Sequence, residues 1–273
     1  MMKQLLIILV FIMAMSSCGT KKTSQKGSSH SDNYKSTTES KETGDPVSKH
    51  AIHWGYTGDG APDKWSTLKP EYKVCANGKN QSPIDIQKAV KNKTLKDIQF
   101  NYKDTNLGVL NNGHTIQVNY APGSFAIIGG KKYNLLQFHF HSPSEHTVSG
   151  KPYPLEMHLV HKGADGLAVV GVFFKDGKEN PFLKDIWANM SSEVNKPKAT
   201  SIKINALKAL PDKKGYFHYS GSLTTPPCSE GVNWNVLSTP VEASGSQVKS
   251  FLDLIKANAR PVQPLNGRVI QEK

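Results

Sequence analysis

The sequence predicts a single, mainly β domain with a few short peripheral helices. Over residues 50–273, short apolar runs alternate with Gly, Pro, Asn and Asp, a pattern typical of strands bounded by turns. Segments with helical periodicity are few and short. The connections between the apolar runs are too short for crossover helices, which favours a mostly antiparallel or mixed sheet over a parallel βαβ sheet.

Nine apolar runs have strand character and two segments have helical character. The predicted strands are 98–100, 107–110, 115–120, 124–128, 134–140, 155–161, 167–174, 215–219 and 232–240. The predicted helices are 182–190 and 246–258, and Ser246 is the expected N-cap of the second.

The N-terminus has the pattern of an export signal over residues 1–17. Lys3 precedes an apolar run over residues 5–15, which is too short to anchor the chain across a bilayer. Cys18 follows two serines, as in the bacterial lipobox, where that cysteine is acylated. The alternative is a plain secretory signal cleaved nearby. Both interpretations predict an exported, periplasmic or cell-envelope protein, and the first adds a lipid anchor in a membrane.

The composition of residues 18–49 predicts a tether that joins Cys18 to the domain. The segment after Cys18 consists largely of Lys, Ser, Thr, Gly and Glu, with almost no apolar surface to bury. Such a composition favours disorder over a packed fold.

The formal net charge of +12 indicates a basic surface. The lysines are scattered and lack the interleaved aromatic residues of a nucleic-acid site, so the sequence predicts no nucleic-acid partner. For an exported protein, the charge is more typical of solubility or of contact with anionic lipid and polysaccharide.

Cys75 and Cys228 are the cysteines that follow Cys18. Export to an oxidising compartment favours a disulfide between them, and the alternative is a pair of buried thiols.

His139 and His141 predict a metal site. One residue separates them, His139 within the predicted strand 134–140 and His141 just after it, so their side chains share one face, while Phe138 and Phe140 take the other. A zinc ion in a catalytic site takes three protein ligands and keeps one position for water. Each histidine alone is more readily explained as a structural residue, and the pattern of several histidines favours the metal site.

The strand 155–161 offers the third ligand. Glu156 and His158 share one face of this strand, whereas His161, three residues after His158, takes the opposite face. We therefore expect His158 to be the ligand and His161 to be a core histidine.

Nine short segments of the domain form a recognisable series: WGY (54–56), QSPIDI (81–86), NNGH (111–114), QFHFH (137–141), SEHT (144–147), EMH (156–158), SLTTPPC (222–228), NWNVLSTP (233–240) and RPVQPL (260–265). They occur in the order that is found in the α-class carbonic anhydrases, and the match extends from about His53 to Arg268. On these segments the domain resembles that family over nearly its whole length.

The resemblance implies a fold and a reaction. The fold is a central, mostly antiparallel sheet of about ten strands, and the reaction is the reversible hydration of CO₂ to bicarbonate and a proton by a zinc-bound hydroxide. The ligands it implies are His139, His141 and His158, in agreement with the spacing. The pKa of about 7 for the zinc-bound water is the value established for carbonic anhydrase itself.

Four further residues gain roles from the resemblance. Gln137 and Glu156 each precede a ligand by two residues on the same strand face, where they can accept the ring N–H of that histidine. Thr224 and Glu145 resemble the pair that orients the nucleophile, because a carboxylate can only accept and so makes the Thr224 hydroxyl its donor. Without the resemblance, Thr224 would be interpreted as a turn residue.

His114 resembles the proton shuttle of the family, because an imidazole with a pKa near 6.5 can deliver protons to buffer. Its alternative interpretation is an exposed turn histidine. Tyr56 and Gln117 would hold the connecting waters, although the family often has a smaller amide at the position of Gln117.

The resemblance also assigns the walls of the site. Val160, Val169, Leu223 and Trp234 match the apolar wall beside which CO₂ rests, and Thr225 helps to shape the substrate pocket. Cys75 and Cys228 match the disulfide of exported members, and His146 matches a buried structural histidine.

Two functions of other classes compete with an enzyme. One is a binding or adhesion module that has the same fold but has lost catalysis, and such modules usually lack one of the zinc histidines. The other is a zinc-buffering surface protein, which the lack of a His-rich tract disfavours. The sequence leaves the oligomeric state open, with a dimer among the options.

Overall fold

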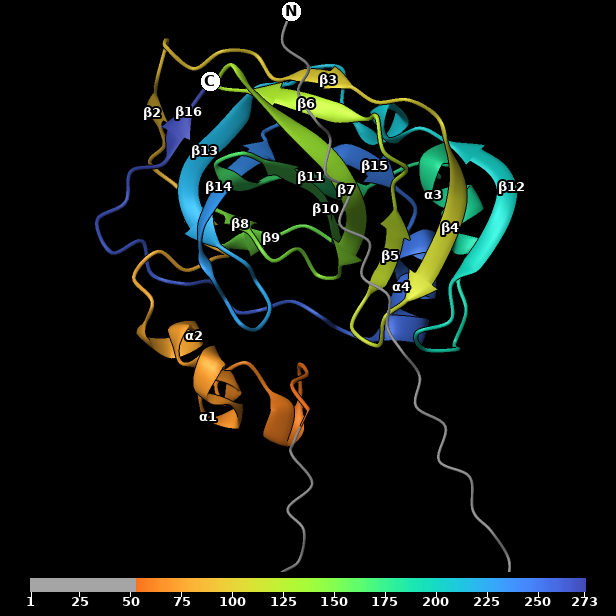
Figure 1. Ribbon diagram of the computed structural model, residues 1–273, viewed down its shortest axis with the longest axis horizontal. Coiled ribbons are helices and arrows are strands. Elements are labelled where there is room, and N and C mark those ends of the chain that lie inside the picture. Colours follow the sequence, from red (N-terminus) through yellow and green to blue (C-terminus); the bar gives the residue numbers. More distant parts are fainter. Residues whose placement is uncertain (1–52) are drawn as a thin grey trace, which may run out of the picture. The chain divides into compact units, whose positions relative to one another are not determined.

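The computed structural model describes residues 53–273, so the predicted signal segment, Cys18 and the whole of the predicted tether lie outside the described residues. The described part of the chain is mainly β, as predicted, with 13 strands in one sheet and three in a small second sheet. Figure 1 shows the large sheet as a twisted surface through the middle of the domain.

The strands have the following bounds: β1 Asp85–Ile86, β2 Val90–Lys91, β3 Gln99–Asn101, β4 Thr105–Asn111, β5 Ile116–Asn119, β6 Phe125–Ile128, β7 Lys131–His141, β8 Thr147–Val148, β9 Lys151–Pro152, β10 Leu155–Gly163, β11 Gly166–Asp176, β12 Lys198–Ile204, β13 Tyr216–Ser222, β14 Glu230–Leu237, β15 Val241–Ala243 and β16 Gln271–Glu272.

The main path of the large sheet runs β12-β4-β5-β7-β10-β11-β14-β13-β16-β2, and β3, β6 and β15 pair at its sides. Most neighbours are antiparallel, but β14 and β15 run parallel to β11, and β2 runs parallel to β16. The sheet is therefore mixed at these points. Parallel neighbours need a long connection. Strands β11 and β14 have one, because α3, β12 and β13 lie between them in the sequence.

All nine predicted strands are present, with ends shifted by a few residues. The sequence did not predict β12, whose residues are mostly Lys, Thr, Ser and Ala with exposed side chains. This strand lies at the edge of the sheet, pairs only with β4 and is interrupted by a register shift. A polar edge strand has few apolar residues to mark it, because little of its surface is buried.

The helices are α1 Trp65–Leu68, α2 Val74–Asn77, α3 Pro181–Trp187 and α4 Gly245–Ile255. The first two are single turns that the sequence did not predict. The predicted N-cap of α4 is wrong. The side chain of Ser244, and not that of Ser246, accepts from the backbone N–H of Gln247, and the Gln247 side chain accepts from the backbone N–H of Ser244. This capping box starts the helix one residue earlier.

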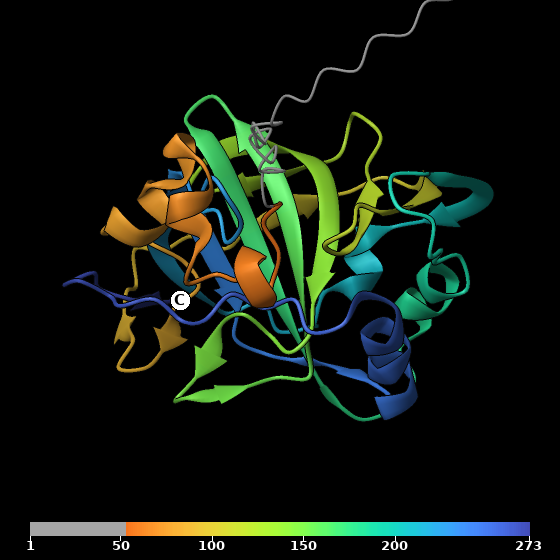
Figure 2. The ribbon, with the colours of Figure 1, turned by 90° about the horizontal axis from the view of Figure 1, so that it is seen from below.

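Helices α3 and α4 pack on each other at one side of the strands, and α1 and α2 lie at another side (Figure 2). The Trp187 ring stacks on Phe251 at 5.7 Å, and its indole N–H donates to the carbonyl of Gln247. Among the described residues, no helix is long and apolar enough to cross a membrane.

The main core lies between the sheet and these two helices. Phe138 and Phe140 of β7 are fully buried in it, on the face opposite to the neighbouring histidines. Strand β7 is therefore covered on one face by the core, and its other face carries the candidate site.

Candidate metal centre

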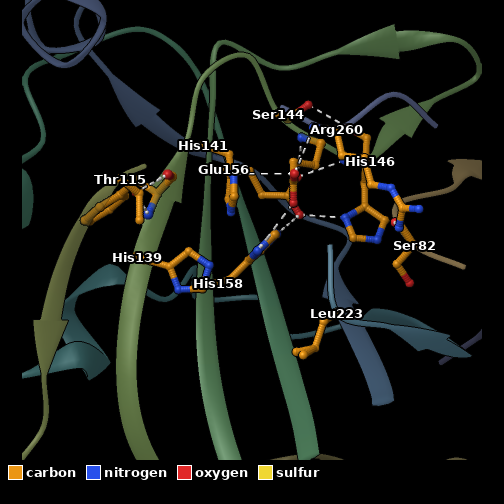
Figure 3. Close-up of polar contacts among 12 residues, drawn as sticks. Ser82, Thr115, His139, His141, Ser144, His146, Glu156, His158, Leu223 and Arg260 are labelled. Atoms are coloured by element: carbon orange, nitrogen blue, oxygen red, sulfur yellow. Dashed lines mark hydrogen bonds and ion pairs between the residues drawn. The ribbon is translucent and has the colours of Figure 1, made fainter. Parts of the chain in front are cut away.

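The three predicted ligands lie on neighbouring strands. His139 and His141 are two residues apart on β7, and antiparallel β10 places His158 directly opposite His139. Figure 3 shows the three rings turned toward one another, and their centroids are 4.6 to 5.4 Å apart.

His161 lies apart from this cluster, as predicted. A register shift between Val160 and His161 interrupts the pairing of β10 with β7, and the His161 side chain is fully buried. Its Nε2 lies 2.7 Å from the Tyr102 hydroxyl. Burial lowers the pKa of His161 to about 4, so this ring is a neutral core residue.

Each of the three candidate ligands uses one ring nitrogen to donate a hydrogen bond. His139 Nδ1 donates to Gln137 Oε1 at 2.9 Å, and His158 Nε2 donates to Glu156 Oε1 at 2.9 Å. His141 Nδ1 donates to the backbone carbonyl of Asn258 at 2.8 Å. These bonds leave Nε2 of His139, Nε2 of His141 and Nδ1 of His158 with lone pairs for a metal.

The free nitrogens fit a metal ion. The three histidines each offer a ring nitrogen within 4.8 Å of the others. His141 Nε2 is buried and has no hydrogen-bond partner among the described residues, although buried polar atoms are rarely left without one. A ring nitrogen of this kind is satisfied when it coordinates a cation, and three imidazoles are a ligand set that suits zinc.

The electrostatics of the three rings agree with this interpretation. Burial, and then the neighbouring histidines, hold the pKa of His139 well below its ordinary value, and burial also lowers the pKa of His141. Burial disfavours the charged form of His158 too, but Glu156 outweighs burial and raises the pKa of His158. A carboxylate that accepts a hydrogen bond from one ring nitrogen makes the other ring nitrogen more basic and therefore a stronger metal ligand.

A second group, His146, Glu156 and His158, also has metal-ligand spacing. Its nitrogen and oxygen atoms are already paired. His146 Nδ1 donates to Glu156 Oε1 at 2.8 Å, and His146 Nε2 lies 2.6 Å from the Tyr219 hydroxyl. We therefore interpret this group as a hydrogen-bond network and not as a metal site.

Glu156 is the centre of that network (Figure 3). Its Oε1 accepts from both His146 and His158, and its Oε2 accepts from the backbone N–H groups of Glu145 and His146. Burial alone raises the pKa of Glu156, but the two histidines outweigh burial and hold the pKa well below the ordinary value. Glu156 is thus a fixed anion that orients His158.

Gly171 leaves room for this carboxylate. It pairs with His158 on the adjoining strand β11, and a Cβ atom at this position would lie 3.0 Å from Glu156 Oε1. A larger residue would displace the carboxylate or the strand.

Glu145 and Thr224 are both buried beside the three histidines. Glu145 Oε1 accepts from the backbone N–H of Arg260 at 2.9 Å, and Oε2 lies 3.8 Å from His158 Nδ1. Oε2 has no hydrogen-bond partner among the described residues, so the expected bond from the Thr224 hydroxyl is not formed in the structure. An unpaired buried carboxylate oxygen remains an acceptor for that hydroxyl, and the pairing stays a prediction.

The predicted apolar wall comes together in one cavity of about 130 Å³. Val160, Val169 and Trp234 follow one another across β10, β11 and β14. Leu223 completes the wall, and Thr225 lies at its edge with Thr224. His139 and His158 line the same cavity, so a small apolar molecule held there would lie beside the metal ligands.

A second cavity of about 140 Å³ extends from His139 and His141 toward His114. Tyr56 and Gln117, the residues expected to hold the connecting waters, are among its lining residues, and so is Thr225. The Gln117 side chain donates to Asn119 Oδ1 at 2.7 Å and accepts from Asn112 at 3.3 Å, so it is held in place at the wall. Burial raises the pKa of Tyr56 well above its ordinary value, which keeps its hydroxyl neutral.

His114 differs from the expectation for a shuttle in one respect. Its ring stacks on Trp54 with centroids 3.6 Å apart, and burial, with the nearby His53, lowers the pKa of His114 to about 4. An imidazole with this pKa is a weak proton acceptor at neutral pH. The sequence did not point to His53 or Trp54 as its partners.

The predicted disulfide between Cys75 and Cys228 is present. Arg260 links it to the site: its guanidinium donates to the carbonyl of Cys75 at 2.7 Å, while its backbone N–H holds Glu145. On the other side, Gln81 donates to the carbonyl of Cys228. The loop that carries Thr224 and Thr225 is therefore tied to α2 by a covalent bond and to the segment around Gln81 by a hydrogen bond.

Comparison with known proteins gives consistent results. A family model described as eukaryotic-type carbonic anhydrase matches residues 60–273. The carbonic anhydrase of Pectobacterium carotovorum is 45% identical over 224 residues, which cover 81% of this chain and 91% of that protein. The carbonic anhydrase of Klebsiella pneumoniae is 47% identical over 233 residues, covering 83% and 94%.

A solved structure agrees with these relatives. The α-carbonic anhydrase of Thermovibrio ammonificans, determined in complex with the inhibitor sulfanilamide, is 48% identical and superposes with a TM-score of 0.78. The match covers 80% of this chain and 98% of that one.

Proposed function

The chain belongs to the eukaryotic-type carbonic anhydrase family, enzymes that hydrate CO₂ reversibly to bicarbonate, and from this premise we propose that it does so with a zinc ion held by His139, His141 and His158. One observation carries the proposal. Each ring has one nitrogen held by a hydrogen bond and one directed to the others, and that of His141 is buried without a partner.

When bound, zinc would act as a Lewis acid that makes a water molecule nucleophilic at neutral pH. Residues of the chain would orient the attacking oxygen. The carboxylate of Glu145 can only accept, so in the pairing we propose the Thr224 hydroxyl would donate to it and would offer its own lone pair to the O–H of the attacking oxygen. This arrangement would direct the attack toward the cavity lined by Val160, Val169, Leu223 and Trp234.

The test is direct. Purified, oxidised protein is expected to contain about one zinc per chain by elemental analysis and to accelerate CO₂ hydration in stopped-flow measurements. Removal of zinc with a chelator should abolish the activity, and added zinc should restore it. A zinc-loaded, oxidised sample without activity would contradict the proposal and favour the binding module.

We further propose that His114 carries the proton away from the site. The cavity that joins it to His139 and His141 supports this role, because its polar lining can hold water between them. In the His114→Ala variant we expect kcat in weak buffer to fall, approaching the ~100-fold contribution of a positioned proton-transfer group, with kcat/KM nearly unchanged. Added imidazole should restore part of kcat, whereas an unchanged kcat would exclude the role.

Export and lipid anchoring remain proposals from the sequence. The apolar run before Cys18 supports a signal that is removed at this cysteine, and the tether would then join an acylated Cys18 to the domain. Mass spectrometry of protein extracted from membranes should find a lipid-modified Cys18 as the first residue. An unmodified N-terminus at another residue would exclude the anchor.

A further inference from the structure

Two histidines that are distant in the sequence meet at the outer end of the cavity that leads to the metal ligands. His53 Nε2 lies 3.3 Å from His114 Nε2, and the ring centroids are 5.1 Å apart. His53 is exposed, whereas the His114 ring is half-buried. One imidazole must donate and the other accept across this contact, so a proton lies between the two rings.

The surroundings of His114 leave His53 as its nearest proton partner. The cavity wall contains no Asp, Glu, Lys or Arg among the described residues that line it. Tyr56 stays neutral because burial raises its pKa. The stack on Trp54 holds the His114 ring nearly parallel to the indole, at 9°, with Nε2 directed at His53.

We infer that His53 is the outer proton carrier of this enzyme, taking from His114 each proton that leaves the site. The His114 imidazolium gives up its Nε2 proton, and the Nε2 lone pair of His53 accepts it. A buffer base then removes one proton from His53, which returns to the neutral form. The inference rests on the proposed shuttle role of His114.

The physical reason lies in the unequal exposure of the two rings. Burial lowers the pKa of His114 to about 4, so a proton on this ring does not stay and must pass on quickly. An exposed imidazole can exchange its proton directly with buffer in bulk water. The pair thus separates two tasks: His114 receives protons from the cavity, and His53 releases them.

Variants of the full-length, zinc-loaded protein test this role. His53→Gln keeps an amide that can hydrogen-bond to His114 but cannot carry a proton, and His53→Ala removes both properties. Thr57→Ala, an exposed position in the same segment, is the matched control. We expect both His53 variants to lower kcat severalfold in weak buffer, with kcat/KM unchanged and with recovery in imidazole buffer. Thr57→Ala should retain the wild-type kcat.

A double variant separates this inference from the proposed function. His53→Ala combined with His114→Ala should be as slow as His114→Ala alone, because His53 acts only through His114. If His114→Ala is slow but His53→Gln keeps the wild-type kcat, His53 only holds the ring and the inference is wrong, while the shuttle stands. If His114→Ala also keeps the wild-type kcat, both roles fail.

Discussion

Replacing His139 with alanine is expected to remove zinc and CO₂ hydration together. Catalytic zinc sites use three protein ligands, and the variant keeps only His141 and His158. It also leaves Gln137 Oε1 without its donor. We expect hydration to fall by more than the roughly 10- to 100-fold that loss of a ligand's hydrogen-bond partner costs. Zinc content by elemental analysis and stopped-flow rates measure the two effects.

His114→Ala is the matched control for this variant. It also removes an imidazole beside the same cavity but leaves the three ligand candidates intact, so it should retain one zinc per chain. A His139→Ala protein that kept both full zinc content and full activity would show that the assigned ligand set is wrong.

Removing the disulfide is expected to cause the largest loss of stability. Cys75 and Cys228 are 153 residues apart, and loop-closure entropy predicts a loss of about 4 to 5 kcal/mol for a loop of this length. The double variant Cys75→Ser/Cys228→Ser should therefore unfold at a clearly lower guanidinium concentration. Equilibrium unfolding followed by tryptophan fluorescence gives the free energy of unfolding.

Reduction of the wild-type protein provides the comparison for the double variant. A thiol reductant should lower the wild-type stability to that of the variant and should leave the variant unchanged. A loss below about 1 kcal/mol in the variant would mean that the bond does little to limit the unfolded chain.

The strands that carry the site could be predicted because their faces are chemically distinct. In β7, Phe138 and Phe140 alternate with His139 and His141, so a period of two separates the buried aromatic face from the ligand face. The same parity distinguished His158 from His161 on β10. The polar edge strand β12 and the single turns α1 and α2 lack such a pattern, and their formation depends on contacts with distant segments.

Several partners in the site could not be predicted from local sequence. The acceptor for His141 is the backbone carbonyl of Asn258, 117 residues away, and a carbonyl leaves no mark in the sequence. His53 meets His114 only after the chain folds, across 61 residues. His146 was expected to be structural, but its bonds to Glu156 and Tyr219 require the packed sheet.

The sequence by itself determined the β class, the two strands that present the three histidines, and the family to which the segments point. These properties follow from alternation along single strands and from short motifs, which are local. Only the tertiary structure decided which ring nitrogen each histidine leaves free, that Glu156 joins His146 to His158, and that His114 is half-buried against Trp54 and beside His53. These properties depend on burial and on hydrogen bonds between distant segments, which packing alone brings together.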